Sequence, residues 1–251
     1  MAAAGKLLTA HRVSRRFGGL CAVDEVSIDL EFGALHALIG TNGAGKSTLI
    51  NVLAGQLKAT GGRVELLGQD ITRWSQPRRA RAGLGRSYQI STLFPSFTVL
   101  ENCRLAAQAN FPRPWDWVTP AMRCRRSLQA AEEAIERVGL SGVARRLVGT
   151  LSHGERRQLE IAVCLAGSPQ VLLLDEPLAG MGAEESARML ELLQKLKPGH
   201  ALLLVEHDMD AVFRIADRIT VMVNGRVIAS DEPHAVRANA EVQRAYLGDA
   251  P

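Results

Sequence analysis

The segment ALHALIGTNGAGKSTLINVLAG, residues 34–55, decides the fold class of this chain. It begins with an apolar run of strand length, continues through a glycine-rich stretch, and ends in KSTLINVLAG, which has the apolar spacing of a helix. Within it, GTNGAGKST at Gly40 to Thr48 satisfies the pattern G-x-x-x-x-G-K-[S/T]. A strand, a glycine-rich loop and a helix in this order predict a phosphate-binding site in an α/β protein.

The phosphate loop offers the groups that a nucleoside triphosphate requires. Glycines let backbone N–H groups curl around phosphate oxygens, and the helix N-terminus adds positive potential. Lys46 is predicted to reach the β- and γ-phosphates, and Ser47 to ligate magnesium. The alternative is an incidental glycine-rich turn. The predicted nucleotide-binding residues of the loop are Gly40, Asn42, Gly43, Ala44, Gly45, Lys46, Ser47 and Thr48.

A second segment, VLLLDEP at Val171 to Pro177, places two carboxylates at the end of a buried strand. Adjacent buried acids are costly unless a cation or a reaction uses them. We expect Asp175 to hold magnesium and Glu176 to act as the general base toward the attacking water. The alternative is a strand-end acidic pair that caps a helix.

A third segment, LSHGERRQLEIAVCLAG, begins at Leu151. By itself, Ser152 with Glu155 three residues later predicts a capping box at the start of a helix. A helix N-terminus opened by Ser152 and Gly154 is also an anion site suited to a γ-phosphate. The two interpretations are compatible.

In this order and at this spacing, the three segments resemble the phosphate loop, the acidic strand end and the signature segment of ABC ATPases. The resemblance covers essentially the whole chain and implies ATP and Mg²⁺ as cofactors. It implies an α/β fold of the P-loop NTPase, ABC nucleotide-binding type, with an N-terminal antiparallel β subdomain and an inserted helical subdomain. We expect one domain over residues 1–251, with its core in 1–90 and 166–251 and the helical subdomain, including the signature segment (Leu151–Glu155), in 91–165.

Three further residues match family positions. Phe17, in RRFGGL, corresponds to the aromatic residue that stacks on adenine; a core or strand-edge Phe is the alternative. Gln89, in RSYQIS, corresponds to the glutamine that senses magnesium and the γ-phosphate, against an ordinary surface Gln. His207, in VEHD, corresponds to the switch histidine that contacts the γ-phosphate, against a structural His at a strand end. The resemblance therefore implies catalytic roles for Glu176, His207 and Gln89, and metal-binding roles for Ser47, Gln89 and Asp175.

The family pairs two ATPase domains head to tail, so that each ATP lies between one chain's phosphate loop and the other chain's signature segment. A second ATPase chain is thus an expected partner, with Ser152 and Gly154 serving its nucleotide. The sequence departs from the family pattern at His153 and Glu155, where the signature usually has glycine and glutamine, and at Gly182, where aspartate or asparagine is usual. A regulatory ATP-binding module without hydrolysis is an alternative that draws on Gly182.

Local features narrow the subfamily: RRFGGLCAV, VEHDM, a Pro/Trp-rich insertion and the ending VQRAYLG. Together they resemble the ATP-binding subunit of bacterial importers for branched-chain and other hydrophobic amino acids. Such systems pair two ATPase chains with two membrane permeases and a periplasmic solute-binding protein. Importers of urea or short-chain amides, which SHGE resembles, and lipopolysaccharide export, which shares YLG, are alternatives. A non-transport ABC ATPase is disfavoured by the absence of a long coiled coil or a second cassette, and no nucleic-acid partner is expected.

Composition is that of a folded globular protein, with 47% apolar and 22% charged residues. Its longest apolar runs, such as residues 171–175 and 201–205, fall far short of the roughly 20 residues that cross a bilayer. We expect a cytoplasmic protein, peripheral on the inner face of the cell membrane. Four cysteines without a C-x-x-C pair predict reduced, mostly buried thiols. The chain has two arginine clusters, and we expect both to be solvated surface side chains. The alternative is that they contact an acidic partner or a membrane surface. The clusters are Arg78, Arg79, Arg81 and Arg86, and then Arg113, Arg123, Arg125 and Arg126.

Overall fold

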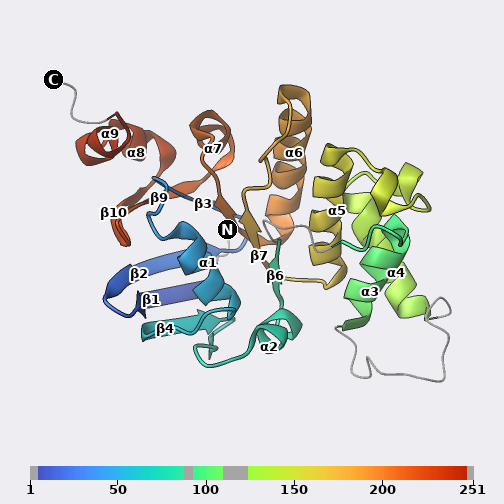
Figure 1. The fold of residues 1–251 in the computed structure, drawn as a ribbon, viewed down its shortest axis with the longest axis horizontal. Helices are drawn as coiled ribbons and strands as arrows, with labels where there is room; N and C mark the ends of the chain where they lie inside the picture. The colour runs from blue at the N-terminus through green and yellow to red at the C-terminus, as the bar shows by residue number, and fades with distance from the viewer. Residues whose placement is uncertain (1–4, 88–92, 110–123, 248–251) are drawn as a thin grey trace.

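The computed structural model describes residues 5–87, 93–109 and 124–247. It places an antiparallel sheet, a larger sheet and a group of helices side by side (Figure 1). The antiparallel sheet has the order β2-β1-β4-β5. Its strands are β1 (Lys6–Phe17), β2 (Leu20–Glu31), β4 (Gly61–Leu66) and β5 (Gln69–Asp70).

The larger sheet has six strands in the order β10-β9-β3-β8-β7-β6. All neighbouring pairs are parallel except β9 with β10, which form a hairpin. The strands are β3 (Leu35–Gly40), β6 (Leu84–Arg86), β7 (Val171–Asp175), β8 (Ala201–Val205), β9 (Arg218–Val223) and β10 (Arg226–Asp231). A mostly parallel sheet flanked by helices agrees with the predicted α/β class.

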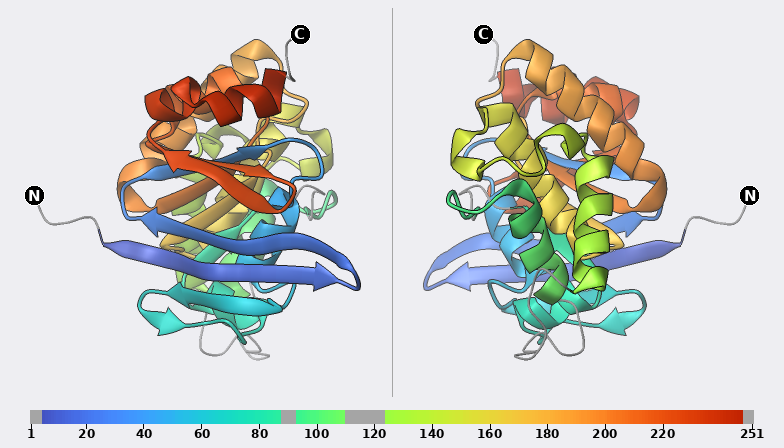
Figure 2. Two further views of the ribbon diagram at one scale, coloured as in Figure 1. Left: turned by 90° about the vertical axis from the view of Figure 1, so that its left-hand side faces the viewer. Right: turned by 90° about the vertical axis from the view of Figure 1, so that its right-hand side faces the viewer.

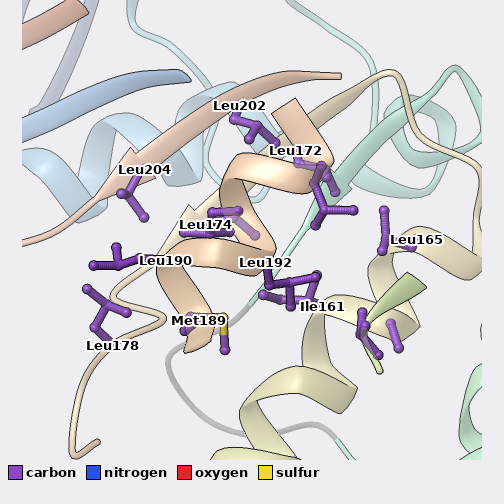
Figure 3. Packing of buried hydrophobic residues seen from close by; sticks show 14 of the residues in the cluster. Ile161, Leu165, Leu172, Leu174, Leu178, Met189, Leu190, Leu192, Leu202 and Leu204 are labelled. Atoms are coloured by element: carbon purple, nitrogen blue, oxygen red, sulfur yellow. The ribbon is translucent and has the colours of Figure 1, made fainter. Parts of the chain in front are cut away.

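The larger sheet separates two hydrophobic cores, and β7 contributes to both. Side chains alternate between the faces of a strand, so Leu172 and Leu174 lie in one core while Val171 and Leu173 lie in the other. In the first core, Leu172 and Leu174 pack with Leu202 and Leu204 of β8 against α5 (His153–Ala166) and α6 (Ala183–Leu196) (Figure 3). This explains why both strands are continuous apolar runs.

The second core joins the two sheets through α1 (Lys46–Ala54), the helix that follows the phosphate loop. Leu49, Ile50 and Leu53 of α1 pack among residues of β1, β2 and β4 and of the larger sheet. Beside it, α2 (Gln76–Arg81) carries Arg79, which is only 2% exposed. The prediction of solvated arginines is therefore wrong for Arg79, whose guanidinium is used within the fold, and for Arg86, whose side chain is 8% exposed.

The helices α3 (Val99–Ala109), α4 (Arg125–Arg137) and α5 pack against one another on one side of the molecule (Figures 1 and 2). The capping box predicted at the start of α5 is confirmed. Glu155 N–H donates to Ser152 Oγ at 3.2 Å, and Ser152 N–H donates to Glu155 Oε2 at 2.7 Å. Most of the Pro/Trp-rich insertion, residues 110–123, lies outside the described residues.

The C-terminal part contains the β9-β10 hairpin, whose turn is Asn224-Gly225, where both residues have positive φ, 47° and 81°. Its turn makes two backbone contacts: Asp24 N–H donates to Gly225 O at 2.8 Å, and Gly225 N–H donates to Ala44 O at 3.0 Å. The remaining helices are α7 (Met209–Ile215), α8 (Pro233–Ala238) and α9 (Ala240–Leu247). The last two are separate short helices, because the chain is extended at Asn239.

Within the described ranges, no helix has both the length and the hydrophobicity to cross a bilayer. All four cysteines are free. Only Cys103 is fully buried, so the prediction of mostly buried thiols is wrong for Cys21, Cys124 and Cys164, which are partly buried.

Candidate active site

The predicted chemical groups meet at one edge of the larger sheet. Strands β3, β8 and β7 are adjacent and parallel, so their carboxyl ends point the same way. The phosphate loop follows β3, the acidic pair ends β7, and His207 follows β8. This edge is where open α/β sheets bind their ligands.

Close contacts in the phosphate loop require glycine at two positions. A Cβ at Gly40 would overlap the carbonyl oxygen of Met222, and one at Gly45 would overlap that of Ala22. Gly45 also has φ of 99°, in the region that side chains disfavour. Lys46 Nζ donates to Gly40 O at 2.6 Å and Thr41 O at 3.0 Å, so the ammonium lies inside the curve of the loop. Burial lowers the pKa of Lys46, against the opposing influence of Glu176 and Asp175.

Asp175 is a buried carboxylate, 3% exposed, at the end of β7. Its backbone N–H donates to Ser87 Oγ at 3.1 Å, and its Oδ2 lies 3.7 Å from Arg86 Nη2. Among the described residues, its buried Oδ1 has no hydrogen-bond partner. Burial raises the pKa of Asp175, while Arg86 opposes the shift. A buried carboxylate oxygen without a donor is a place where a cation would be stabilised.

The oxygen atoms of Asp175 and Ser47 are suitable ligands for magnesium. Mg²⁺ prefers oxygen ligands, and it is commonly held by one or two protein groups together with substrate phosphates and water. Asp175 offers the unpaired carboxylate oxygen, and Ser47, at the exposed start of α1, offers a hydroxyl. The described part of the chain contains no cluster of three or more His, Cys, Asp or Glu side chains able to enclose a metal. Two protein ligands, with the nucleotide's phosphate oxygens completing the coordination of Mg²⁺, would therefore be a suitable site.

Glu176 has an unusual backbone. Its φ is 50°, in the left-handed region that non-glycine residues rarely adopt, and its N–H donates to Val205 O at 2.9 Å. Such conformations cost about 1–3 kcal/mol and tend to occur at functional sites. Asp175 is buried whereas Glu176 is only partly buried, so the two successive acids occupy different surroundings.

His207 lies just beyond β8, after Glu206, a residue not predicted from the sequence to belong to the site. The Glu206 side chain is 0% exposed. Its Oε1 accepts the Leu178 N–H at 2.9 Å, and its Oε2 accepts the His207 N–H at 3.2 Å. Burial raises the pKa of Glu206, and these two backbone donors oppose the shift. Glu206 therefore connects the segment after the acidic pair to His207, whose own side chain is largely exposed.

Phe17 ends β1 and is 43% exposed, so it is not a core residue. The guanidinium carbon of Arg15 lies 4.4 Å from the centre of its ring. The exposed ring is available for stacking. Gln89, by contrast, falls in residues 88–92, outside the described residues.

Ser152 and Gly154 lie at the N-terminus of α5, on a different element from Lys46. A cavity of about 460 Å³ adjoins them, lined also by Glu185 and Met189 of α6. Gly154 is buried, and a Cβ there would lie 2.5 Å from Glu185 Oε1. The signature segment is thus packed against the start of α6.

Comparison with known proteins decides the family. The family described as "ABC transporter" matches residues 23–179, and "Branched-chain amino acid ATP-binding cassette transporter" matches residues 226–251. The chain belongs to the ABC transporter family. It is 39% identical to the high-affinity branched-chain amino acid transport ATP-binding protein LivG of Escherichia coli K12, over 97% of this chain and 98% of that protein. The corresponding BraF protein of Pseudomonas aeruginosa is 38% identical over 97% and 98%. The predicted family resemblance is confirmed, and the chain is an ABC ATPase.

Solved structures agree with this ABC ATPase fold. A nucleotide-free ATP-binding cassette from an ABC transporter superposes with a TM-score of 0.87 at 30% identity, over 98% of this chain and all of that one. The ADP conformation of an ATP-binding cassette gives a TM-score of 0.85 at 31% identity, over 98% and 100%. The predicted fold class is therefore confirmed.

Three side chains of the candidate site were not predicted as site residues from the sequence: Ser87, Arg86 and Glu206. Each acts on a group far away in the chain, since Ser87 and Arg86 contact Asp175, and Glu206 contacts Leu178. For Glu206, an acid at the end of the apolar run 201–205 was a usable signal. It is the same signal that selected Asp175 and Glu176.

Proposed function

We propose that this ABC ATPase is the ATP-binding and ATP-hydrolysing subunit of a bacterial importer for branched-chain or other hydrophobic amino acids. The observation that carries the proposal is the meeting of the phosphate loop and the acidic pair at one sheet edge. The substrate class is supported by the near full-length similarity to LivG and BraF and by the match over residues 226–251.

In this proposal, Phe17 stacks on adenine, and the backbone and side chains from Gly40 to Thr48 surround the phosphates. Lys46 exchanges its carbonyl partners for phosphate oxygens, which are stronger acceptors because they are charged. Gly40 and Gly45 let the loop pack closely against Met222 of β9 and Ala22 of β2, so neighbouring strands hold the phosphate loop in place.

Hydrolysis is assigned to Glu176, which accepts a proton from the attacking water. Ser47 and Asp175 are the residues that would hold Mg²⁺, with Gln89 as a further ligand. When bound, the ion neutralises charge on the phosphates. His207 contacts the γ-phosphate, and Glu206 fixes the backbone from which His207 projects.

Assembly follows from the location of the signature segment. Ser152 and Gly154 are assigned to the nucleotide of a second ATPase chain in a head-to-tail dimer. The further partners are membrane permease subunits and, indirectly, a periplasmic solute-binding protein, with this chain on the cytoplasmic face of the membrane. In the proposed division of the single domain, residues 1–90 and 166–251 form the core, and 91–165 form the helical subdomain.

The alternative substrates are urea or short-chain amides, and lipopolysaccharide for an exporter. The signature sequence SHGE supports the first and the YLG ending the second. Both local similarities are shorter than the match over residues 226–251, which supports amino-acid import.

The test is the Glu176→Gln variant in the intact transporter. We expect ATP binding to be retained and turnover to fall by about 100-fold or more, because general-base catalysis contributes about 10²–10⁴-fold. ATP-dependent leucine uptake into vesicles should be lost with it. The matched control is Glu184→Gln, which removes a carboxylate that is 87% exposed on α6. This variant should keep wild-type ATP turnover and leucine uptake.

Two results would contradict the proposal. Wild-type turnover by Glu176→Gln would remove Glu176 as the base. Uptake of urea but not of leucine by the active transporter would replace the substrate class while leaving the ATPase assignment intact.

A further inference from the structure

The loop between the acidic pair and α6, residues 177–182, is held by side chains from two different elements. From the end of β8, Glu206 accepts the Leu178 N–H at 2.9 Å. From the start of α5, His153 Nε2 lies 3.1 Å from Ala179 O. Because a carbonyl oxygen only accepts, His153 Nε2 carries the hydrogen and donates it.

His153 also packs on the next residue of this loop. A Cβ at Gly180, where φ is 76°, would lie 3.2 Å from His153 Nε2, so the imidazole lies directly beside the glycine. On the neighbouring position of α5, Gly154 leaves room for the Glu185 side chain. Two successive residues of the signature segment therefore contact the loop and the first turn of α6.

A glycine at position 153, which is usual in the family, has no side chain with which to make this contact. The departure at His153 thus creates a hydrogen bond between two segments that, under the proposed head-to-tail arrangement, serve different ATP molecules. Ser152 would bind the partner's nucleotide. The loop, in contrast, directly follows Glu176, which acts on this chain's own nucleotide.

We propose that His153 is a positioning residue that fixes Ser152 relative to the loop after Glu176, so that the two half-sites of this chain act as one unit. This inference rests on the proposed ATPase function. The imidazole touches neither nucleotide. It acts through the Ala179 carbonyl on one side and through the first turn of α5 on the other.

The test compares two substitutions at this exposed position. His153→Phe keeps a ring beside Gly180 and removes the donor, whereas His153→Gln keeps an N–H donor. For each variant, ATP turnover is measured in the intact transporter, and ATP affinity and binding stoichiometry are measured on the full chain with a fluorescent ATP analogue.

We expect His153→Phe to lower kcat about tenfold and His153→Gln to remain within about twofold of wild type, since one hydrogen bond is at stake. ATP affinity should change less than about twofold in both, because the phosphate loop is untouched, and one site per chain should remain. This combination separates a positioning role from a folding defect, which would lower the number of sites.

Wild-type turnover by His153→Phe, or a His153→Gln variant as slow as His153→Phe, would overturn the inference. Glu176→Gln is measured in parallel. If that variant hydrolyses ATP normally, the proposed function fails, whereas if it is inactive and His153→Phe is fully active, only the role of His153 fails.

Discussion

Lys46 shows how a single residue is prepared for its ligand. Its ammonium is buried and donates to two loop carbonyls, Gly40 O and Thr41 O. Burial destabilises this charge and lowers the pKa of Lys46, while the carboxylates of Glu176 and Asp175 oppose the shift. Phosphate oxygens would restore the favourable environment.

Replacing Lys46 by alanine should therefore weaken ATP binding by about 10- to 100-fold, since hydrogen bonds to charged groups contribute about 1.5–3 kcal/mol. The measurement is a titration with a fluorescent ATP analogue. Lys58→Ala removes the same charge from an exposed side chain near the end of α1 and is the control. Equal affinities for the two variants would argue against the phosphate-loop assignment.

Between elements, the contact of α2 with α1 depends on one buried cation. Arg79 Nη1 donates to Val52 O at 2.8 Å and to Leu53 O at 2.6 Å, and Nη2 donates to Thr72 O at 3.0 Å. The first two acceptors are carbonyls in the last turn of α1, where Val52 O also accepts the Gly55 N–H at 3.1 Å. Burial lowers the pKa of Arg79 to about 10.

We expect Arg79→Met to lower the free energy of unfolding by about 2–4 kcal/mol, because methionine fills part of the space but donates to none of the carbonyls that Arg79 binds. Urea denaturation measures the change. Arg81→Met, at an exposed position of the same helix, should stay within about 0.5 kcal/mol of wild type. A similar loss of unfolding free energy in both variants would mean that the hydrogen bonds from Arg79 to α1 contribute little to stability.

At the scale of the whole molecule, His36 connects the two sheets. It lies in β3, and its Nδ1 donates to Asp29 O of β2 at 2.9 Å. Its Nε2 lies 2.7 Å from Thr220 Oγ1 of β9, which in turn lies 2.8 Å from Ser230 Oγ of β10. Burial lowers the pKa of His36 to about 4, and nearby Arg218 adds to the shift while the Asp29 carbonyl opposes it.

This depressed pKa predicts a pH-dependent stability. Between pH 6.5 and pH 4 the unfolded chain binds a proton at His36 that the folded chain does not, so acidification favours unfolding. The full effect is on the order of 3 kcal/mol, present above pH 6.5 and lost toward pH 4. Denaturant titrations of wild type and His36→Gln at several pH values should show a weaker decline for the variant. Parallel curves would exclude His36 as the source.

Local sequence patterns are sufficient to predict those structures whose interactions lie between residues close together in the chain. The strand, loop and helix around Lys46, the capping box at Ser152 and the turn at Asn224 were all predictable, because each is specified within a few residues. The burial of Arg79 could not be predicted in this way, because two of its acceptors, Val52 O and Leu53 O, lie 27 and 26 residues away. Such pairings exist only once the elements have packed together, and no local spacing encodes them.

The turn at Gly225 lies between the phosphate loop and the C-terminal tail. Its amide donates to Ala44 O of the phosphate loop and its carbonyl accepts from Asp24, while the tail that matches branched-chain amino acid ATP-binding cassette transporters begins one residue later, at Arg226. A chimera that exchanges this tail between relatives can therefore take everything from residue 226 onward, provided that the junction leaves Asn224 and Gly225 in place. Moving the splice point upstream would disturb the phosphate loop together with the tail.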